Sequence, residues 1–314
     1  MTLSPQFKGY AFALLATIAG STVYIFSKAA LDQVSLAQFG VYWFAMAIVW
    51  NSLFALRSAK HRHFHPIPRS SFKVLVLIGL IEIVATGTFY AAISVSENPA
   101  IPSFLRNMEY IFVTLMGVIL LNERFKRIEI LAVILTFSGA FVISFQKSAS
   151  FESYLSGASG LMLISTLFYG IRTITAKKNI HEISPTMLSI NRAIFLLVFA
   201  GIMLVIYRQG LAIPTKALIM IIIGSFFGPF LTSLSQYSAL VYLDASRSAI
   251  LQSTTPLFVI LGAYLVFERF PLGYQIIGGI LTIAGPMLLI TGKKFPFKRK
   301  TILHRMVRNN KSTS

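Results

Sequence analysis

The sequence predicts an all-α membrane protein of ten transmembrane helices, arranged as two inverted repeats of five helices. Three observations lead to this fold class: an apolar composition, ten apolar runs of spanning length, and a similarity between the two halves of the chain. Of the 314 residues, 55% are hydrophobic and 12% are charged. A soluble domain carries about 25% charged residues. Lipid is therefore the expected solvent, because helices satisfy their own backbone groups there.

The ten runs follow one another with mostly short connections. A spanning helix needs about 20 apolar residues, and each run approaches or exceeds that length. The first run is too long for the apolar core of a signal peptide and lacks a convincing cleavage site. We expect spans at 9–31, 36–56, 73–94, 100–121, 128–146, 157–176, 186–206, 216–240, 245–267 and 273–292.

Basic residues predict the orientation. If the N-terminus is cytoplasmic, 19 of the 28 Lys and Arg residues fall in cytoplasmic segments and 4 in outside loops. The positive-inside rule then predicts an inner-membrane protein with both termini in the cytoplasm. The basic tail, 293–314, would also attract anionic membrane lipid. The net charge of +18 does not indicate nucleic-acid binding, because the basic residues form short clusters between apolar runs.

The second half of the chain repeats the first. Three matches in the same order share an offset of 145 to 149 residues: Asn122–Phe125 with Phe267–Phe270, Tyr90 with Tyr237, and Lys28 with Lys177. We expect one five-helix repeat over 1–147 and another over 148–292. Because five is odd, the second repeat enters from the opposite side of the membrane. Inverted repeats of this kind typically bind substrate at their interface, near the midplane.

Several motifs recur at repeat positions. A Glu-Arg pair follows the fourth and ninth runs, and a glycine-containing helix follows each pair, with Gly139 and Gly285. The seventh run carries Ser184, Pro185, Leu188 and Arg192. In these features the chain resembles the EamA family of the drug/metabolite transporter superfamily, from about residue 8 to 292. The resemblance implies transport of small organic solutes such as amino acids. Trp43 stands where the first half would match Arg192, so the halves differ at that depth.

Four ionisable residues lie well inside predicted spans: Glu82, Arg106, Glu109 and Arg192. Each costs roughly 2.5–3.5 kcal/mol to insert. Arg106 and Glu109 are three residues apart and so share a helical face. In one interpretation they line a polar cavity, where an arginine binds a substrate carboxylate and a glutamate binds a proton or an ammonium group. In the other, they are ion pairs that lock helices together.

Uncharged residues complete the candidate substrate site: Tyr24, Tyr90, Asn107, Tyr169, Gln236 and Tyr237, with Asn191 and Gln252 as further candidates. Sites combine aromatic walls with a few polar groups, although aromatic residues in lipid also serve as packing or belt residues. Near predicted helix ends, we expect Lys28, Arg172 and Arg247 to snorkel to the interface, with Asp244 beside them. In the eighth run, Gly224 and Gly228 predict close packing, and Pro229 allows a break.

No cofactor or metal site is expected. The chain has no Cys, and His61, His63 and His65 alternate in a basic loop that would repel a cation. A nucleotide-binding loop is also missing from the sequence. Membrane-embedded enzymes usually show His or acidic clusters at a membrane face, so an enzyme is not expected either.

Together these features predict a secondary transporter of small organic metabolites, amino-acid-like or related, that works by alternating access, with export as the favoured direction. The alternatives are a lipid-type flippase and a non-transporting membrane scaffold. Substrate identity, proton coupling and homodimer formation are left open by the sequence.

Overall fold

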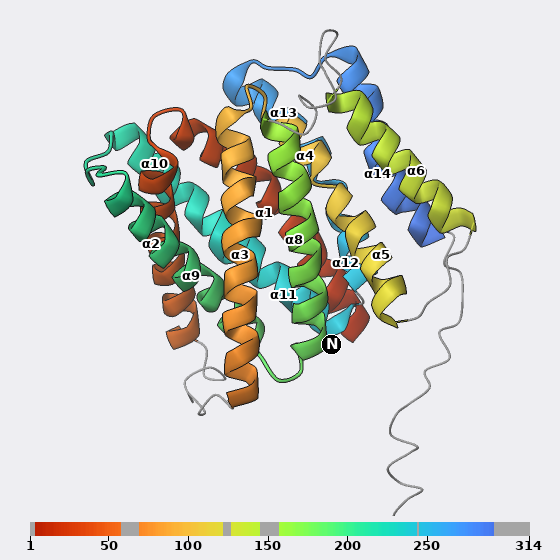
Figure 1. The fold of residues 1–314 in the computed structure, drawn as a ribbon, viewed down its shortest axis with the longest axis horizontal. Helices are drawn as coiled ribbons and strands as arrows, with labels where there is room; N and C mark the ends of the chain where they lie inside the picture. Colours follow the sequence, from red (N-terminus) through yellow and green to blue (C-terminus); the bar gives the residue numbers. More distant parts are fainter. Residues whose placement is uncertain (1–3, 58–68, 122–126, 145–156, 244, 292–314) are drawn as a thin grey trace, which may run out of the picture.

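Helices make up nearly all of the computed structural model, which describes residues 4–57, 69–121, 127–144, 157–243 and 245–291 (Figure 1). Those ranges contain no strand. The first-half helices are α1 (Pro5–Leu31), α2 (Leu36–Arg57), α3 (Arg69–Val95), α4 (Ala100–Leu105), α5 (Met108–Leu121) and α6 (Arg127–Ser144). The second-half helices are α8 (Gly157–Asn179), α9 (Pro185–Ile206), α10 (Thr215–Ser225), α11 (Ser233–Tyr242), α12 (Ala245–Gln252), α13 (Thr255–Phe267) and α14 (Gly273–Thr291).

Some predictions fall outside the described residues. They concern His61, His63 and His65, the pair Glu123–Arg124, Asp244, and the basic tail 293–314. The side chain of Arg247 is likewise not described.

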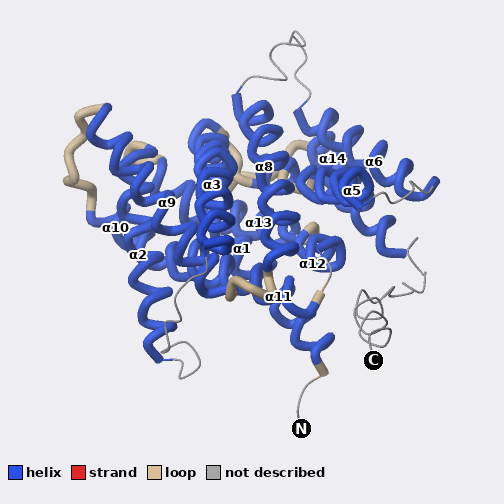
Figure 2. Tube along the Cα trace, turned by 60° about the horizontal axis from the view of Figure 1, so that its bottom comes forward, coloured by secondary structure: helices blue, strands red, loops and turns tan. Residues whose placement is uncertain are grey.

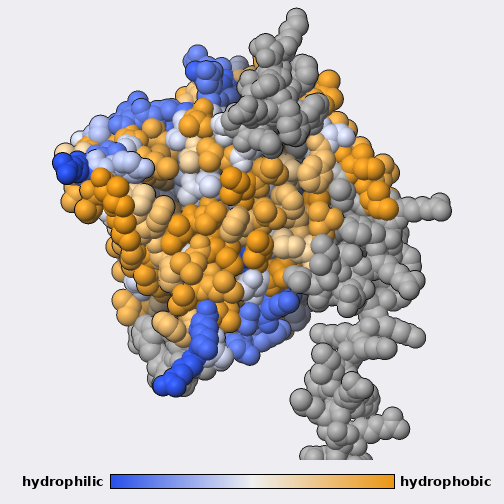
Figure 3. Space-filling model, viewed as in Figure 1, coloured by the Kyte–Doolittle hydropathy of each residue, from blue (hydrophilic) through white to orange (hydrophobic). Residues whose placement is uncertain are grey.

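The outer surface of the bundle is apolar. Five helical stretches, including Arg69–Val95 and Pro185–Ile206, are long and apolar enough to cross a membrane, and three shorter helices are apolar as well. Large side chains such as Leu80, Val198 and Ile202 point outward and are exposed. In Figure 3 the hydrophobic surface forms a broad band between hydrophilic side chains at the two ends. A soluble monomer rarely exposes such a continuous patch, so this surface suits lipid.

Ser-Pro pairs start two of the helices. Ser4 precedes α1 and Ser184 precedes α9, and each hydroxyl accepts a hydrogen bond at 3.2 Å from the backbone N–H three residues later. The following proline occupies the first turn, where its missing N–H has no intrahelical partner to lose. The Ser-Pro pair of the seventh run is thus explained locally as a helix start.

The helices of the two halves pack against each other in matching pairs. The second helices of the two repeats, α2 and α9, pack against each other, and so do the fifth helices, α6 and α14. The third helix of each repeat packs against the first helix of the other repeat. In one such pair α3 lies along α8, and in the other α10 and α11, which together form the third helix of the second repeat, lie along α1. The two like-with-like pairs stand at opposite ends of the molecule (Figure 2). This is the pattern that a two-fold relation between the halves produces.

Glycines bring paired backbones close together. A Cβ on Gly139 of α6 would lie 2.5 Å from the carbonyl oxygen of Gly278 in α14, and one on Gly285 would lie 2.7 Å from that of Ala132 in α6. A Cβ on Gly224 would lie 2.5 Å from Cβ of Phe26. Such contacts admit no larger side chain without separating the helices. The close packing expected at Gly224 is therefore confirmed.

The fourth and ninth runs are each interrupted once. Within the expected spans 100–121 and 245–267, Arg106–Asn107 separates α4 from α5 and Ser253–Thr254 separates α12 from α13. Hydrogen bonds at the breaks span three residues, as from Glu109 N–H to the Arg106 carbonyl at 3.0 Å and from Leu257 N–H to the Thr254 carbonyl at 3.1 Å. The two breaks are 147 residues apart and so occupy the same repeat position.

Pro229 distorts the eighth run without ending it. The chain forms a π-helical segment over Phe226–Thr232, between α10 and α11. The Thr232 hydroxyl donates to the Phe227 carbonyl at 2.7 Å, which occupies one acceptor in this widened turn. π-helical turns often mark functional positions. At the matching place in the first repeat, α3 continues through Glu82 without interruption.

Two lysines tie helix ends together in the same way. Lys28 Nζ at the end of α1 donates to the Ser94 carbonyl at the end of α3, at 3.3 Å, and pairs with Asp32 at 2.7 Å. Lys177 Nζ near the end of α8 donates to the Leu240 and Leu243 carbonyls at the end of α11, both at 2.8 Å. The α3 and α8 ends involved lie at opposite ends of the bundle (Figure 1).

Candidate functional site

A small cavity with a mixed polar, charged and aromatic lining lies at the centre of the bundle, between the two helix breaks. Its volume is about 50 Å³, enough for a few waters. A second cavity of about 20 Å³ shares part of its lining and extends toward Leu240 at the Lys177 end. The main polar and aromatic lining residues of the central cavity are Tyr24, Phe89, Tyr90, Arg106, Asn107, Tyr110, Tyr169, Arg172, Arg192, Gln236, Gln252 and Thr255.

Glu82, in the middle of α3, joins four helices. Its Oε1 accepts from Arg172 Nη1 at 3.3 Å and from the Tyr237 hydroxyl at 3.1 Å. Its Oε2 accepts from the Thr86 hydroxyl at 2.6 Å and from Arg192 Nε at 3.0 Å. The residue is fully buried, and the four contacts fill the acceptor positions of its carboxylate. Glu82 therefore links α3 to α8, α9 and α11.

Glu109, in the first turn of α5, holds the second cluster of charges. It accepts from Arg106 Nε at 2.9 Å, from the Thr173 hydroxyl at 3.1 Å and from Arg172 Nη2 at 3.5 Å. Arg172 contacts Glu82 as well, so one guanidinium bridges both carboxylates. A buried carboxylate needs such partners, since an unpaired charge is costly there.

The expectation that Arg172 snorkels to the interface is wrong. The residue is buried, because α8 continues to Asn179, about two turns beyond Arg172, instead of ending near residue 176. Its position three residues after Tyr169 was the available signal, since residues at that spacing share a helical face. The short side chains Thr86 and Thr173 were also missed, and they complete the shells of Glu82 and Glu109.

Arg106 occupies the break between α4 and α5 and faces the cavity. Its guanidinium carbon lies 3.9 Å from the centre of the Tyr169 ring and 5.1 Å from that of Phe89, within cation–π range. Tyr24 stands edge-on to Phe89 with ring centres 5.3 Å apart. The side chain of Arg106 keeps 15% of its surface exposed, against 5% for Arg172. Among the charged groups of the site, Arg106 thus has the most exposed side chain.

Asn107, the other residue of this break, bonds toward α14. Its Nδ2 donates to the Thr282 hydroxyl at 3.4 Å, while its buried Oδ1 has no partner within the described residues. On the facing helices, Gln236 of α11 donates to Gln252 of α12, which in turn donates to the Ser248 hydroxyl at 3.0 Å. These amides form an uncharged side of the cavity.

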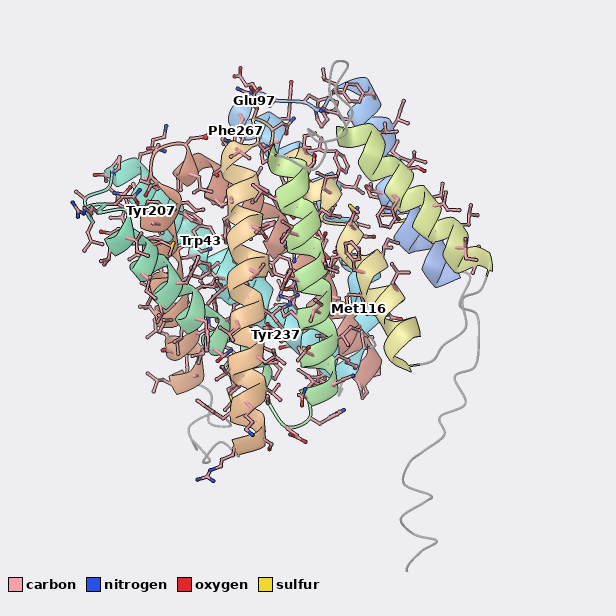
Figure 4. The ribbon with its side chains drawn as sticks, in the orientation of Figure 1. Trp43, Glu97, Met116, Tyr207, Tyr237 and Phe267 are labelled. Atoms are coloured by element: carbon pink, nitrogen blue, oxygen red, sulfur yellow. The ribbon has the colours of Figure 1, made fainter. Side chains whose placement is uncertain are left out.

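The ten candidate residues lie together. Seven line the central cavity, and Glu82, Glu109 and Tyr237 are bonded to that lining or border the second cavity. Figure 4 shows Tyr237 in the interior between α3 and α8, whereas Glu97 and Phe267 lie at one end of the bundle. Of the further candidates, Gln252 lines the cavity, while Asn191 donates to the Leu75 carbonyl at 2.9 Å. The charged candidates are ion-paired, and the arginines also line the cavity.

Comparison with known proteins fits this duplicated arrangement. The model of the EamA-like transporter family matches the chain twice, over residues 7–145 and 157–291. The chain belongs to the EamA-like transporter family. It is a multi-pass membrane protein of a family described as transporters rather than enzymes. No curated protein sequence matches it.

A solved structure described only as "Crystal structure of protein" shares the fold. It superposes with a TM-score of 0.64 at 10% sequence identity, over 91% of this chain and 96% of that chain. At this identity the likeness concerns the fold alone. In this EamA-like protein, the cavity chemistry must be argued from its own residues.

Proposed function

We propose that the protein is a secondary transporter that moves a small organic solute across the inner membrane by alternating access. One observation carries the proposal: a polar, partly charged cavity lies where the two repeats meet, at two helix breaks in matching repeat positions. Interrupted helices at the interface of repeats are typical of transporter binding sites. A non-transporting scaffold would have no need of such a cavity.

The proposed topology has ten spans, with α4–α5, α10–α11 and α12–α13 each counted as one. In this topology the repeats, 1–147 and 148–292, are inverted, and both termini and the tail 293–314 are cytoplasmic. The excess of basic residues in the segments that this orientation places inside supports it. The end of the bundle that carries Lys28 then faces outward, and the end that carries Lys177 faces the cytoplasm.

Alternating access requires two bodies that move against each other around the site. Packing suggests which they are: α3, α4 and α5 gather on α8, and in matching fashion α10, α11, α12 and α13 gather on α1. Lys28 bridges the two bodies at one end of the bundle and Lys177 at the other. With both bridges made and a cavity of only about 50 Å³, the conformation resembles an occluded state.

The substrate-binding residues proposed are Tyr24, Glu82, Tyr90, Arg106, Asn107, Glu109, Tyr169, Arg192, Gln236 and Tyr237. Within this set, Arg106 would hold a carboxylate of an amino-acid-like or related solute, since bidentate arginine–carboxylate pairs are strong and directional. Glu82 and Glu109 already bind arginines, so a role in proton coupling would require those pairs to open. Export is the proposed direction of transport.

A metabolite comparison tests the proposal. Extracellular solutes would be measured in cells that express the wild type, Arg106→Gln or Arg269→Gln. Arg269 is a matched control because its guanidinium pairs with the exposed Glu97 at 3.0 Å, far from the cavity lining. Relative to cells without the gene, we expect the wild type and Arg269→Gln to change the extracellular concentrations of the same solutes. Arg106→Gln should change none, although it is present in the membrane at the same level. A profile unaffected by the wild type would refute transport.

A further inference from the structure

The charged groups around the cavity do not balance. Among the described side chains of the cavity and its ion pairs there are three arginines, Arg106, Arg172 and Arg192, and two carboxylates, Glu82 and Glu109. We infer that the solute is a small organic anion that carries a carboxylate and no ammonium group, such as a 2-hydroxy acid. This inference rests on the proposed transport function and narrows its substrate class.

The excess positive charge resides on Arg106. Arg192 is paired with Glu82, and Arg172 is shared between Glu82 and Glu109. Arg106 forms its ion pair with Glu109 through Nε, and its side chain keeps more exposed surface than those of the other two arginines. A cation in a membrane interior is costly without a counter-charge. A carboxylate against the Nη edge of Arg106 would supply that counter-charge and form a charge-assisted hydrogen bond.

The carboxylates of the site offer an ammonium group no comparable place. The carboxylate of Glu82 accepts four hydrogen bonds and that of Glu109 accepts three, all from groups of the protein. Aromatic faces are the other usual partners of ammonium groups. Of the rings that line the cavity, Tyr169 has the Arg106 guanidinium carbon 3.9 Å from its centre, and Phe89 has the same carbon at 5.1 Å. A zwitterion would therefore gain one favourable contact and bring an unpaired cation next to three arginines.

Asn107 adds the neutral part of the recognition. It follows Arg106 directly in the break, and its buried Oδ1 is an acceptor without a partner in the described part of the chain. An acceptor of this kind suits the hydroxyl of a hydroxy acid, which donates one hydrogen bond without a charge. Arg106 would thus bind the carboxylate of the solute, and Asn107 would accept a hydrogen bond from a hydroxyl beside that carboxylate.

Isosteric pairs of solutes give the sharpest test. Lactate and alanine differ only in a hydroxyl against an ammonium group, as do phenyllactate and phenylalanine. Uptake of each radiolabelled solute would be measured in liposomes reconstituted with the full-length protein. We expect each hydroxy acid to enter about tenfold faster than its amino-acid partner, equivalent to about 1.4 kcal/mol. Arg106→Gln should reduce hydroxy-acid uptake to the level of empty liposomes, while Arg269→Gln should leave it unchanged.

The outcomes separate the two levels of the argument. Equal or faster uptake of alanine and phenylalanine would overturn the anion class while supporting transport. Uptake of none of the four, together with an ammonium-bearing or uncharged solute found in the metabolite comparison, would also overturn it, whereas another carboxylate anion found there would support it. The absence of any transported solute in both experiments would overturn the proposed function itself. Because the wild type alone gives the ratio within each pair, the result does not depend on a variant that folds.

Discussion

The cavity has a charged side, with ion pairs that join α3 and α5 to α8 and α9, and an uncharged side, where α11 and α12 carry Gln236 and Gln252. Tyr237 follows Tyr90 by 147 residues, and the same offset carries Glu82 to Pro229, Arg106 to Ser253 and Glu109 to Pro256. These three charged residues of the first repeat thus correspond to uncharged residues in the second. The framework is duplicated, but the two carboxylates of the site, Glu82 and Glu109, both come from the first repeat, and Arg172 and Arg192 of the second repeat pair with them.

Other duplicated features have stayed alike in both halves. Lys28 and Lys177 reach carbonyl groups 66 residues further along the chain, and Gly139 and Gly285 both bring α6 and α14 together. Helix packing and helix ends depend on backbone geometry, which both repeats need equally. A binding site for a solute without internal symmetry needs only one set of charges, so the two repeats need not carry the same residues there.

The largest expected effect concerns the opposite orientation of the two repeats in the membrane. Reporters that are active only outside the cytoplasm would be fused after Ser150 and after Thr291, each of which follows the fifth helix of its repeat. We expect activity after Ser150 and none after Thr291, because the repeats enter from opposite sides. The same response at both positions would contradict inversion, and the reverse pattern would contradict cytoplasmic termini.

Removal of the central charge on the charged side should cost the most stability. Glu82→Gln leaves Arg172 and Arg192 without the carboxylate that both contact. Breaking a buried ion pair costs about 3–5 kcal/mol, and we expect a loss of that size in the free energy of unfolding in detergent. The matched control is Glu97→Gln, whose exposed pair with Arg269 should contribute less than about 1 kcal/mol. If both variants lost the same free energy of unfolding, the buried ion pairs of Glu82 would contribute no more stability than the exposed pair of Glu97.

Sequence alone located the charged side but not its connections. A glutamate or arginine inside an apolar run is conspicuous because of its insertion cost, and this pointed to Glu82, Arg106 and Arg192. Which arginine contacts which carboxylate depends on helix packing, so the bridging role of Arg172 was not visible. The break at Arg106–Asn107 was missed because neither residue is a proline or a glycine, the usual sequence signs of an interrupted helix.

Substitutions in the shared framework should act alike in both repeats. Gly139→Ala and Gly285→Ala each place a Cβ under 3 Å from a backbone carbonyl of the paired helix. We expect each to lower the free energy of unfolding by about 1–3 kcal/mol, as overpacking does. Gly201→Ala is the control, because a Cβ there meets no atom within 4 Å, and its helix propensity should raise stability by up to about 1 kcal/mol. A large loss in one repeat alone would show that the framework has diverged too.

The two lysine bridges provide the smallest expected effect and the most specific one. Each holds the charged and uncharged sides together at one end, so its loss should favour opening at that end alone. A charge-assisted hydrogen bond contributes about 1.5 kcal/mol, which corresponds to about a tenfold shift between two states.

Since the chain has no Cys, Thr255→Cys, on the uncharged side of the cavity, gives a single site for a membrane-impermeant thiol reagent. We expect Lys28→Met to speed labelling of this cysteine from outside the cell, and Lys177→Met to speed it from the cytoplasmic side of inside-out vesicles. If both variants changed labelling on the same side, the bridges would not be alternating closures, and the two bodies proposed here would have to be divided differently.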